Sequence, residues 1–103
     1  MIVAYVTCAT EEEARKIAFA AVNARLAACA NYWQGSSVFK WKGRTRRSRE
    51  WFLLLKTSEA KRVALRKMVE GLHSYEVPAI LFFKPFSVNK AFVDWVAGET
   101  AFK

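Results

Sequence analysis

Strand-like and helix-like segments alternate along this 103-residue chain in an order that few folds accommodate. Four short segments rich in β-branched, aromatic and large aliphatic residues predict strands at residues 2–8, 29–41, 50–57 and 79–83. Two longer segments carry apolar residues at helical spacing and predict amphipathic helices at residues 10–28 and 58–72. Because connections between elements are short and of fixed hand, this order leaves only a small number of topologies.

The order predicts an α+β fold, a ferredoxin-like βαββαβ sandwich with both helices on one face of an antiparallel four-stranded sheet. A weaker helical pattern at about residues 89–100 places Phe92, Trp95 and Val96 on one side and predicts an extra C-terminal helix. A chain of this length has room for one core, so residues 1–103 are expected to form a single domain.

Local signals refine these elements. Thr10 predicts a capping box, in which its hydroxyl accepts from the Glu13 amide and the Glu13 carboxylate accepts from the Thr10 amide. The run Gly35-Ser36-Ser37 predicts a bulge or bend in the long second strand. Ser58 can cap the second helix, whose inward residues are expected to be Ala60, Val63, Ala64, Met68 and Leu72.

The aromatic content is high for a domain of this size, with four Trp, three Tyr and eight Phe. Each buried ring hides roughly 150–250 Å² of surface, which is more in total than one layer of helices on a sheet covers easily. The open face of the sheet is where the excess rings would lie. We therefore expect a partner subunit to cover some of them.

The chain is basic, with a formal net charge of +8, which favours anionic partners and repels free cations at long range. Ten consecutive residues near the hairpin tip hold six cations and no acid: Lys40, Lys42, Arg44, Arg46, Arg47 and Arg49. Such a basic arm can bind the phosphates of a nucleic acid without sequence preference, or can prevent aggregation of sheet edges. The aromatic motif of the RNA-binding version of this fold is absent, so sequence readout is not predicted.

Other polar residues stand out against apolar surroundings. The single histidine, His73, follows the second helix, where it can either ligate a metal or interact with the negative end of the helix dipole. Glu50 and Lys56 have the same parity on one strand, so both side chains leave the same face of the sheet. This pair indicates a polar pocket, ion pairs across a subunit boundary, or simply a solvated strand end.

Several classes of protein are excluded. Cys8 and Cys29 form no CxxC or Cys/His pattern, so a zinc framework or a disulfide scaffold is not indicated. No phosphate-binding glycine loop and no Ser/His/Asp set is present, which argues against an enzyme or an organic cofactor. The first fourteen residues contain no Lys or Arg, unlike a signal peptide, so a cytoplasmic protein without membrane contact is expected.

Taken in order, the motifs resemble those of the CutA family of divalent-cation tolerance proteins. The resemblance spans nearly the whole chain and rests on Thr7, Arg25-Leu26-Ala27-Ala28-Cys29-Ala30-Asn31, Ser37-Val38-Phe39-Lys40-Trp41-Lys42-Gly43, Glu50, Leu55-Lys56-Thr57, His73-Ser74-Tyr75-Glu76-Val77-Pro78-Ala79-Ile80 and Asp94-Trp95. The chain departs from the family pattern at Ser74, where the family has Pro, and at the basic residues after Gly43, where the family is acidic.

The resemblance implies a non-enzymatic homotrimer, similar to PII-type signalling proteins, that binds a divalent metal such as copper or zinc. In some relatives a cysteine at the position of Val6 is proposed to bind metal together with the histidine; here Cys8 lies two residues further on. His73 is accordingly the predicted metal ligand, and Trp41, Glu50, Lys56 and Tyr75 are predicted to line a ligand pocket near subunit boundaries. The alternative function is a polyanion-binding or nucleic-acid-binding module that uses the basic hairpin at residues 40–49.

Overall fold

A computed structural model of the chain describes residues 1–101, so residues 102 and 103 of the predicted domain lie outside the described part. The strands are β1 (Ile2–Cys8), β2 (Cys29–Trp41), β3 (Arg44–Thr57) and β4 (Ile80–Phe83). The helices are α1 (Glu11–Asn23), α2 (Arg62–Leu72), which follows a 3-10 turn at Glu59–Lys61, and α3 (Lys90–Glu99). This order confirms the predicted ferredoxin-like α+β fold with an additional C-terminal helix.

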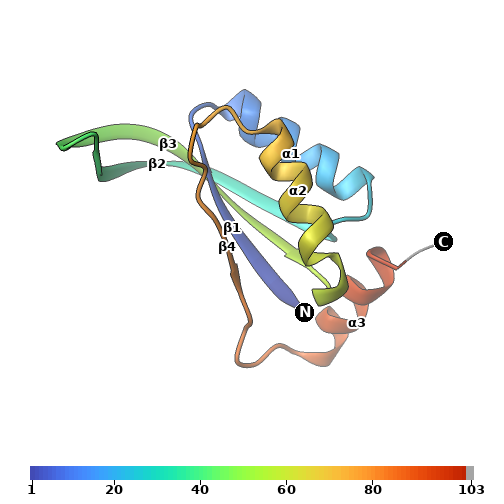
Figure 1. Cartoon of the computed structure of the whole chain (residues 1–103). Helices are drawn as coiled ribbons and strands as arrows, with labels where there is room; N and C mark the ends of the chain where they lie inside the picture. The colour runs from blue at the N-terminus through green and yellow to red at the C-terminus, as the bar shows by residue number, and fades with distance from the viewer. Residues whose placement is uncertain (102–103) are drawn as a thin grey trace.

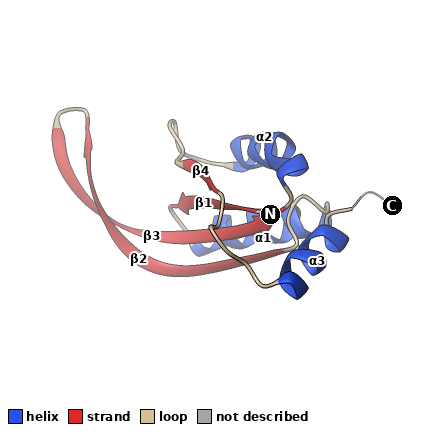
Figure 2. Cartoon of the chain, turned by 90° about the horizontal axis from the view of Figure 1, so that it is seen from below, coloured by secondary structure: helices blue, strands red, loops and turns tan. Residues whose placement is uncertain are grey.

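The four strands form one antiparallel sheet in the order β2-β3-β1-β4. Helices α1 and α2 lie side by side on one face of this sheet (Figure 1). Helix α3 lies at the end of the β2–β3 hairpin opposite to its turn (Figure 1). The opposite face carries no helix (Figure 2). The long β2–β3 hairpin extends beyond the other two strands, because β1 pairs with β3 only as far as Trp51.

The core lies between the sheet and the two helices. Alternate residues of β1 and β3 point into it and are fully buried, among them Ala4, Val6, Leu53 and Leu55. The alanine-rich face of α1 permits close packing on these residues, as predicted, but the helix ends at Asn23 and not at residue 28. In α2 the predicted inward face was partly wrong: Leu65 and Val69 are the buried residues, whereas Val63 is 47% exposed.

Two other local predictions were wrong. The run at residues 35–37 makes no bulge, since the pairing of β2 with β3 keeps one register from Cys29 to Trp41. Gly35 is needed for a different reason: a Cβ atom at this position would lie 2.2 Å from the ring of Phe52. Ser58 does not cap a helix with its side chain, and its hydroxyl instead hydrogen-bonds the hydroxyl of Thr100, which ties α3 to the sheet.

Candidate metal site

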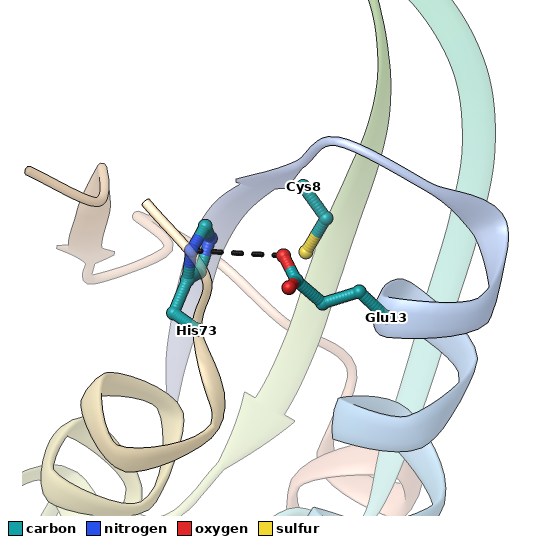
Figure 3. Close-up of side chains that lie close together, drawn as sticks. All are labelled: Cys8, Glu13 and His73. Atoms are coloured by element: carbon teal, nitrogen blue, oxygen red, sulfur yellow. Dashed lines mark ion pairs between the residues drawn. The ribbon is translucent and has the colours of Figure 1, made fainter. Parts of the chain in front are cut away.

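Three side chains of metal-ligating type meet where β1 ends. Cys8 is the last residue of β1, Glu13 lies in the first turn of α1, and His73 follows the last residue of α2 (Figure 3). One potential ligand atom from each residue lies within 4.8 Å of the other two. Three elements that are distant in sequence therefore bring together a thiol, a carboxylate and an imidazole.

Glu13 reaches this cluster because only half of the predicted capping box forms. The Glu13 amide donates to the Thr10 hydroxyl at 3.2 Å, which caps α1 as expected. The Glu13 carboxylate, however, does not return to the Thr10 amide: its Oε2 accepts the amide N–H of Ser74 at 3.1 Å. The loop after α2 competes for the carboxylate and turns it toward His73.

The hydrogen bonds of His73 define its protonation. Its Nε2 lies 2.6 Å from the carbonyl oxygen of Thr7, and a carbonyl can only accept, so Nε2 carries the proton. The other ring nitrogen, Nδ1, accepts the amide N–H of Tyr75 at 3.1 Å. The imidazole side chain is fully buried. These two hydrogen bonds place a proton on Nε2 and direct the lone pair of Nδ1 at the Tyr75 amide, at the edge of the cluster.

Nδ1 of His73 and Oε1 of Glu13 face each other at 3.6 Å, the contact drawn as a dashed line in Figure 3. With the proton on Nε2, both atoms are acceptors, and Oε1 is buried without any hydrogen-bond partner. A buried acceptor left without a partner costs about 1–3 kcal/mol. Two facing acceptors attract only through a cation between them, whether a proton or a metal ion.

The thiol of Cys8 completes the cluster. Its side chain is fully buried, and this burial, followed by the negative charges of Glu13 and Glu50, raises the pKa of the thiol to about 12. The thiol therefore keeps its proton at neutral pH in the metal-free protein. Only a strongly bound cation would displace that proton and convert the sulfur into a thiolate ligand.

Glu50 and Tyr75 form a second polar pair beside the cluster. The Tyr75 hydroxyl donates a hydrogen bond to Oε2 of Glu50 at 2.7 Å. Glu50 is one of the few buried polar residues among residues 1–101. Burial and this hydrogen bond both raise the pKa of Tyr75, so the hydroxyl remains a donor. The rings of Tyr75 and His73 lie 4.8 Å apart, and Tyr75 thus links the buried carboxylate to the imidazole.

Within one chain, the structure brings together three of the five residues predicted for the site. His73, Tyr75 and Glu50 lie around the end of β1, whereas Trp41 lies at the hairpin turn. Lys56 shares a face with Glu50, as its parity predicts, but hydrogen-bonds Asn31 at the opposite end of the strand. Sequence reasoning missed Glu13 as a site residue, because a complete capping box would have directed its carboxylate back to its own helix.

The structure is thus a small α+β protein with a ferredoxin-like sandwich and a thiol, a carboxylate and an imidazole gathered at one end of its sheet. The family model described as "CutA1 divalent ion tolerance protein" matches residues 2–99 of this chain. The chain therefore belongs to the CutA family of divalent-cation tolerance proteins, as its motifs predicted.

Individual relatives agree with this assignment. The divalent-cation tolerance protein CutA of Thermus thermophilus is 37% identical over 99 residues, which cover 95% of this chain and 96% of the relative. Human protein CutA is 36% identical over 98 residues, and the match covers 94% of this chain but only 55% of the human protein. The chain thus spans about half of the human relative and nearly all of the bacterial one.

Solved structures of the family superpose closely on this chain. A crystal structure of CutA1 from Pyrococcus horikoshii carrying the mutation D60A gives a TM-score of 0.94 at 34% identity, covering 98% of this chain and 99% of the other. The structure of a protein named as the periplasmic divalent cation tolerance protein CutA of Archaeoglobus fulgidus gives 0.95 at 31% identity, covering 98% and 100%. The fold is therefore that of the family throughout the matched length.

Proposed function

We propose that this protein binds a divalent transition-metal ion through Cys8, Glu13 and His73, and that it acts as a non-enzymatic cation-responsive protein. The observation that carries the proposal is the buried oxygen Oε1 of Glu13, which has no hydrogen-bond partner and lies 3.6 Å from Nδ1 of His73. A metal ion bound between these atoms would satisfy Oε1. The names of the relatives, which describe divalent-cation tolerance and no reaction, support the same function.

The donor set suits zinc or copper. Thiolate and imidazole favour these metals over magnesium or calcium, which prefer oxygen ligands. Ligand atoms around a tetrahedral zinc lie roughly 3.5 Å apart, so atoms within 4.8 Å of one another must close in by about 1 Å. Binding through Nδ1 would also replace the Tyr75 amide hydrogen bond, so the loop after α2 has to adjust.

The test is a calorimetric titration of the metal-stripped full chain with Zn(II), repeated with Cu(II) under anaerobic conditions. Saturation at about one ion per chain is expected, with the release of a proton from the thiol. Calcium and magnesium are the matched control ions and are expected not to bind. Zinc binding that is absent, or that is no stronger than calcium binding, would contradict the proposal.

Metal affinity is expected to rise with pH. Because the pKa of the Cys8 thiol is raised to about 12, the thiol is protonated throughout the neutral range and must lose one proton on binding. Each unit of pH should therefore increase the zinc affinity about tenfold. Titrations in buffers from pH 6 to pH 8 measure this slope, and Cys8→Ser should flatten it. A wild-type affinity that is independent of pH would mean that the thiol is not a ligand.

We further propose that three chains assemble through the face of the sheet that carries no helix. This open face presents Trp33, Leu81 and Phe83, which are 43–52% exposed in the single chain, beside the stacked rings of Tyr5 and Phe52. The outer edge of β2, thirteen residues long, has no partner strand among residues 1–101. A second copy can cover the rings and pair with this edge, as the family resemblance implies. Such a homotrimer could serve as a PII-like signalling scaffold.

Leu81→Glu is expected to break this assembly. Leu81 lies opposite Tyr5 in the middle rows of the open face, and a buried carboxylate without a partner costs several kcal/mol in an interface. Light scattering should give the mass of three chains for the wild type and a smaller mass for the variant. Val63→Glu is the matched control, because Val63 is similarly exposed, on α2, away from the open face. If Leu81→Glu kept the mass of three chains, as Val63→Glu is expected to do, the result would argue against this interface.

A reducing compartment suits this site, since both cysteines are free thiols in the structure. No helix among the described residues is long and apolar enough to cross a membrane. We propose a cytoplasmic location, although one structural relative is named as periplasmic. Cell fractionation with compartment markers tests this location directly.

A further inference from the structure

Most of the net charge of the chain lies in one short segment. Residues 40–49 hold six of the seventeen Lys and Arg and none of the nine acids. Outside this segment, the remaining eleven basic residues nearly balance the acids. All six cations are exposed, and none forms an ion pair in the described part of the chain. The excess charge of the protein is thus concentrated on the hairpin and is available to a partner.

The segment at residues 36–49, here called the basic arm, is a preformed two-stranded ribbon. It extends away from the helices and from β1 and β4 (Figures 1 and 2). Lys42 and Gly43 both have positive φ, of 51° and 78°, as in the tight two-residue hairpin turns, so pairing continues up to Trp41 and Arg44. From Arg44 to Glu50 the ribbon is about 20 Å long. Little ordering entropy would be lost when a partner binds.

The register of the arm places cations on both faces of the ribbon. On the face continuous with the open face of the sheet, Arg44 lies opposite Trp41 and Arg46 lies opposite Phe39. On the other face, Arg47 lies opposite Val38, and Lys40 and Arg49 share this side by alternation. A ribbon that bound a flat anionic surface would need charge on one face only.

We propose that the basic arm binds double-stranded nucleic acid by entering a groove, where its two faces contact the phosphates of the two strands. The major groove of a duplex admits a two-stranded β-ribbon, and phosphates line both of its walls. The contacts are electrostatic, and contacts to phosphates carry no sequence information, so the proposed binding is independent of sequence. The rings that the proposed trimer would cover lie where β3 pairs with β1 and where β4 pairs with β1, whereas the basic arm extends beyond both β1 and β4 (Figure 1).

The experiment is fluorescence anisotropy with a labelled mixed-sequence DNA duplex of about 20 base pairs, titrated with the full chain at several salt concentrations. If all six cations contact phosphates, the affinity should fall on the order of a thousandfold between 50 and 200 mM salt. The arm variant Arg44→Gln, Arg46→Gln, Arg47→Gln should lower the slope of log affinity against log salt by about 2.7, or about 0.9 for each lost phosphate contact.

A matched control removes the same charge elsewhere. The helix variant Arg62→Gln, Arg66→Gln, Lys67→Gln also loses three exposed cations, from the outer face of α2, and should keep the wild-type salt slope. Equal losses in the arm variant and the helix variant would overturn the proposal, because net charge alone would then explain the binding. The absence of duplex binding at 50 mM salt would overturn it as well. The melting temperature of each variant tests whether it is folded.

Two further comparisons test the groove itself. Arg44→Gln, Arg46→Gln removes charge from one face, and Arg47→Gln, Arg49→Gln removes it from the other. Both double variants should weaken duplex binding to a similar extent, and an effect confined to one face would overturn groove entry. A single strand with the same number of phosphates should bind at least tenfold more weakly than the duplex. Equal affinity for the single strand would also overturn the proposal. None of these results depends on the metal site.

Discussion

Replacing His73 by alanine is expected to lower the zinc affinity of this protein at least about 100-fold. The imidazole supplies one of only three protein ligands, and loss even of a residue that merely orients a ligand commonly costs 10- to 100-fold in affinity. The remaining thiol and carboxylate would also face each other without the nitrogen donor that makes the site selective for zinc. Competition titration with a chromophoric chelator measures the loss.

The control for this result is Tyr75→Phe. The substitution keeps the ring beside His73 and removes only the hydroxyl that donates to Glu50, so zinc affinity should change less than tenfold. Glu13→Gln is a second informative variant, because its side-chain oxygen can still accept the Ser74 amide N–H while the carboxylate charge is lost. It should weaken zinc binding, because a neutral amide is a poorer metal ligand than a carboxylate. An unchanged zinc affinity in His73→Ala would remove this histidine from the site.

The fold was predictable because it rests on patterns that are local in the sequence. The alternation in β1 and the helical spacing in α1 both reflect which side of each element is buried, and their order limits the topology. The interior of α2 was harder to predict. Apolar residues lie on more than one side of that helix, and only packing against α1 and β4 selects Leu65 and Val69 over Val63.

Local sequence patterns also failed to predict where β3 begins. The run from Arg44 to Arg49 has no apolar alternation and was predicted as part of a turn, yet it pairs residue by residue with β2. The two-residue turn at Lys42 and Gly43 sets the register immediately, so the basic residues become strand residues regardless of their modest strand propensity. The arm is a ribbon rather than a loop for this reason.

The candidate site could be predicted only in part. The position of His73 after an amphipathic helix, and the position of Glu50 beside an apolar strand, are visible in the sequence, whereas the burial of Glu50 is seen only in the structure. The role of Glu13 depends on a competition between two backbone amides, those of Thr10 and Ser74, and the second comes from a residue 61 positions away. No local sequence pattern shows which of the two amides will donate to the Glu13 carboxylate. The position of this carboxylate in the cluster is therefore known only from the tertiary structure.

Leu53→Ala is expected to destabilise the fold by about 2–5 kcal/mol, the range for a leucine truncated in a dry core. Leu53 is fully buried opposite Val6, on the strand pair that positions Cys8. Surrounding side chains are held by β1 and α1 and cannot fully collapse into the space that the leucine leaves. Chemical denaturation of metal-free protein at fixed concentration measures the loss, and a cost under about 1 kcal/mol would contradict this placement of the core.

The adjacent residue makes the comparison informative about assembly. Leu54 points to the open face and is only half-buried in the single chain, so Leu54→Ala should cost less than Leu53→Ala wherever the protein is monomeric. If a second copy covers this face, the side chain of Leu54 becomes buried in the interface. The cost of Leu54→Ala should then approach that of Leu53→Ala as the protein concentration rises. A cost that stays small at every concentration would show that the open face remains exposed to water, and would count against the trimer.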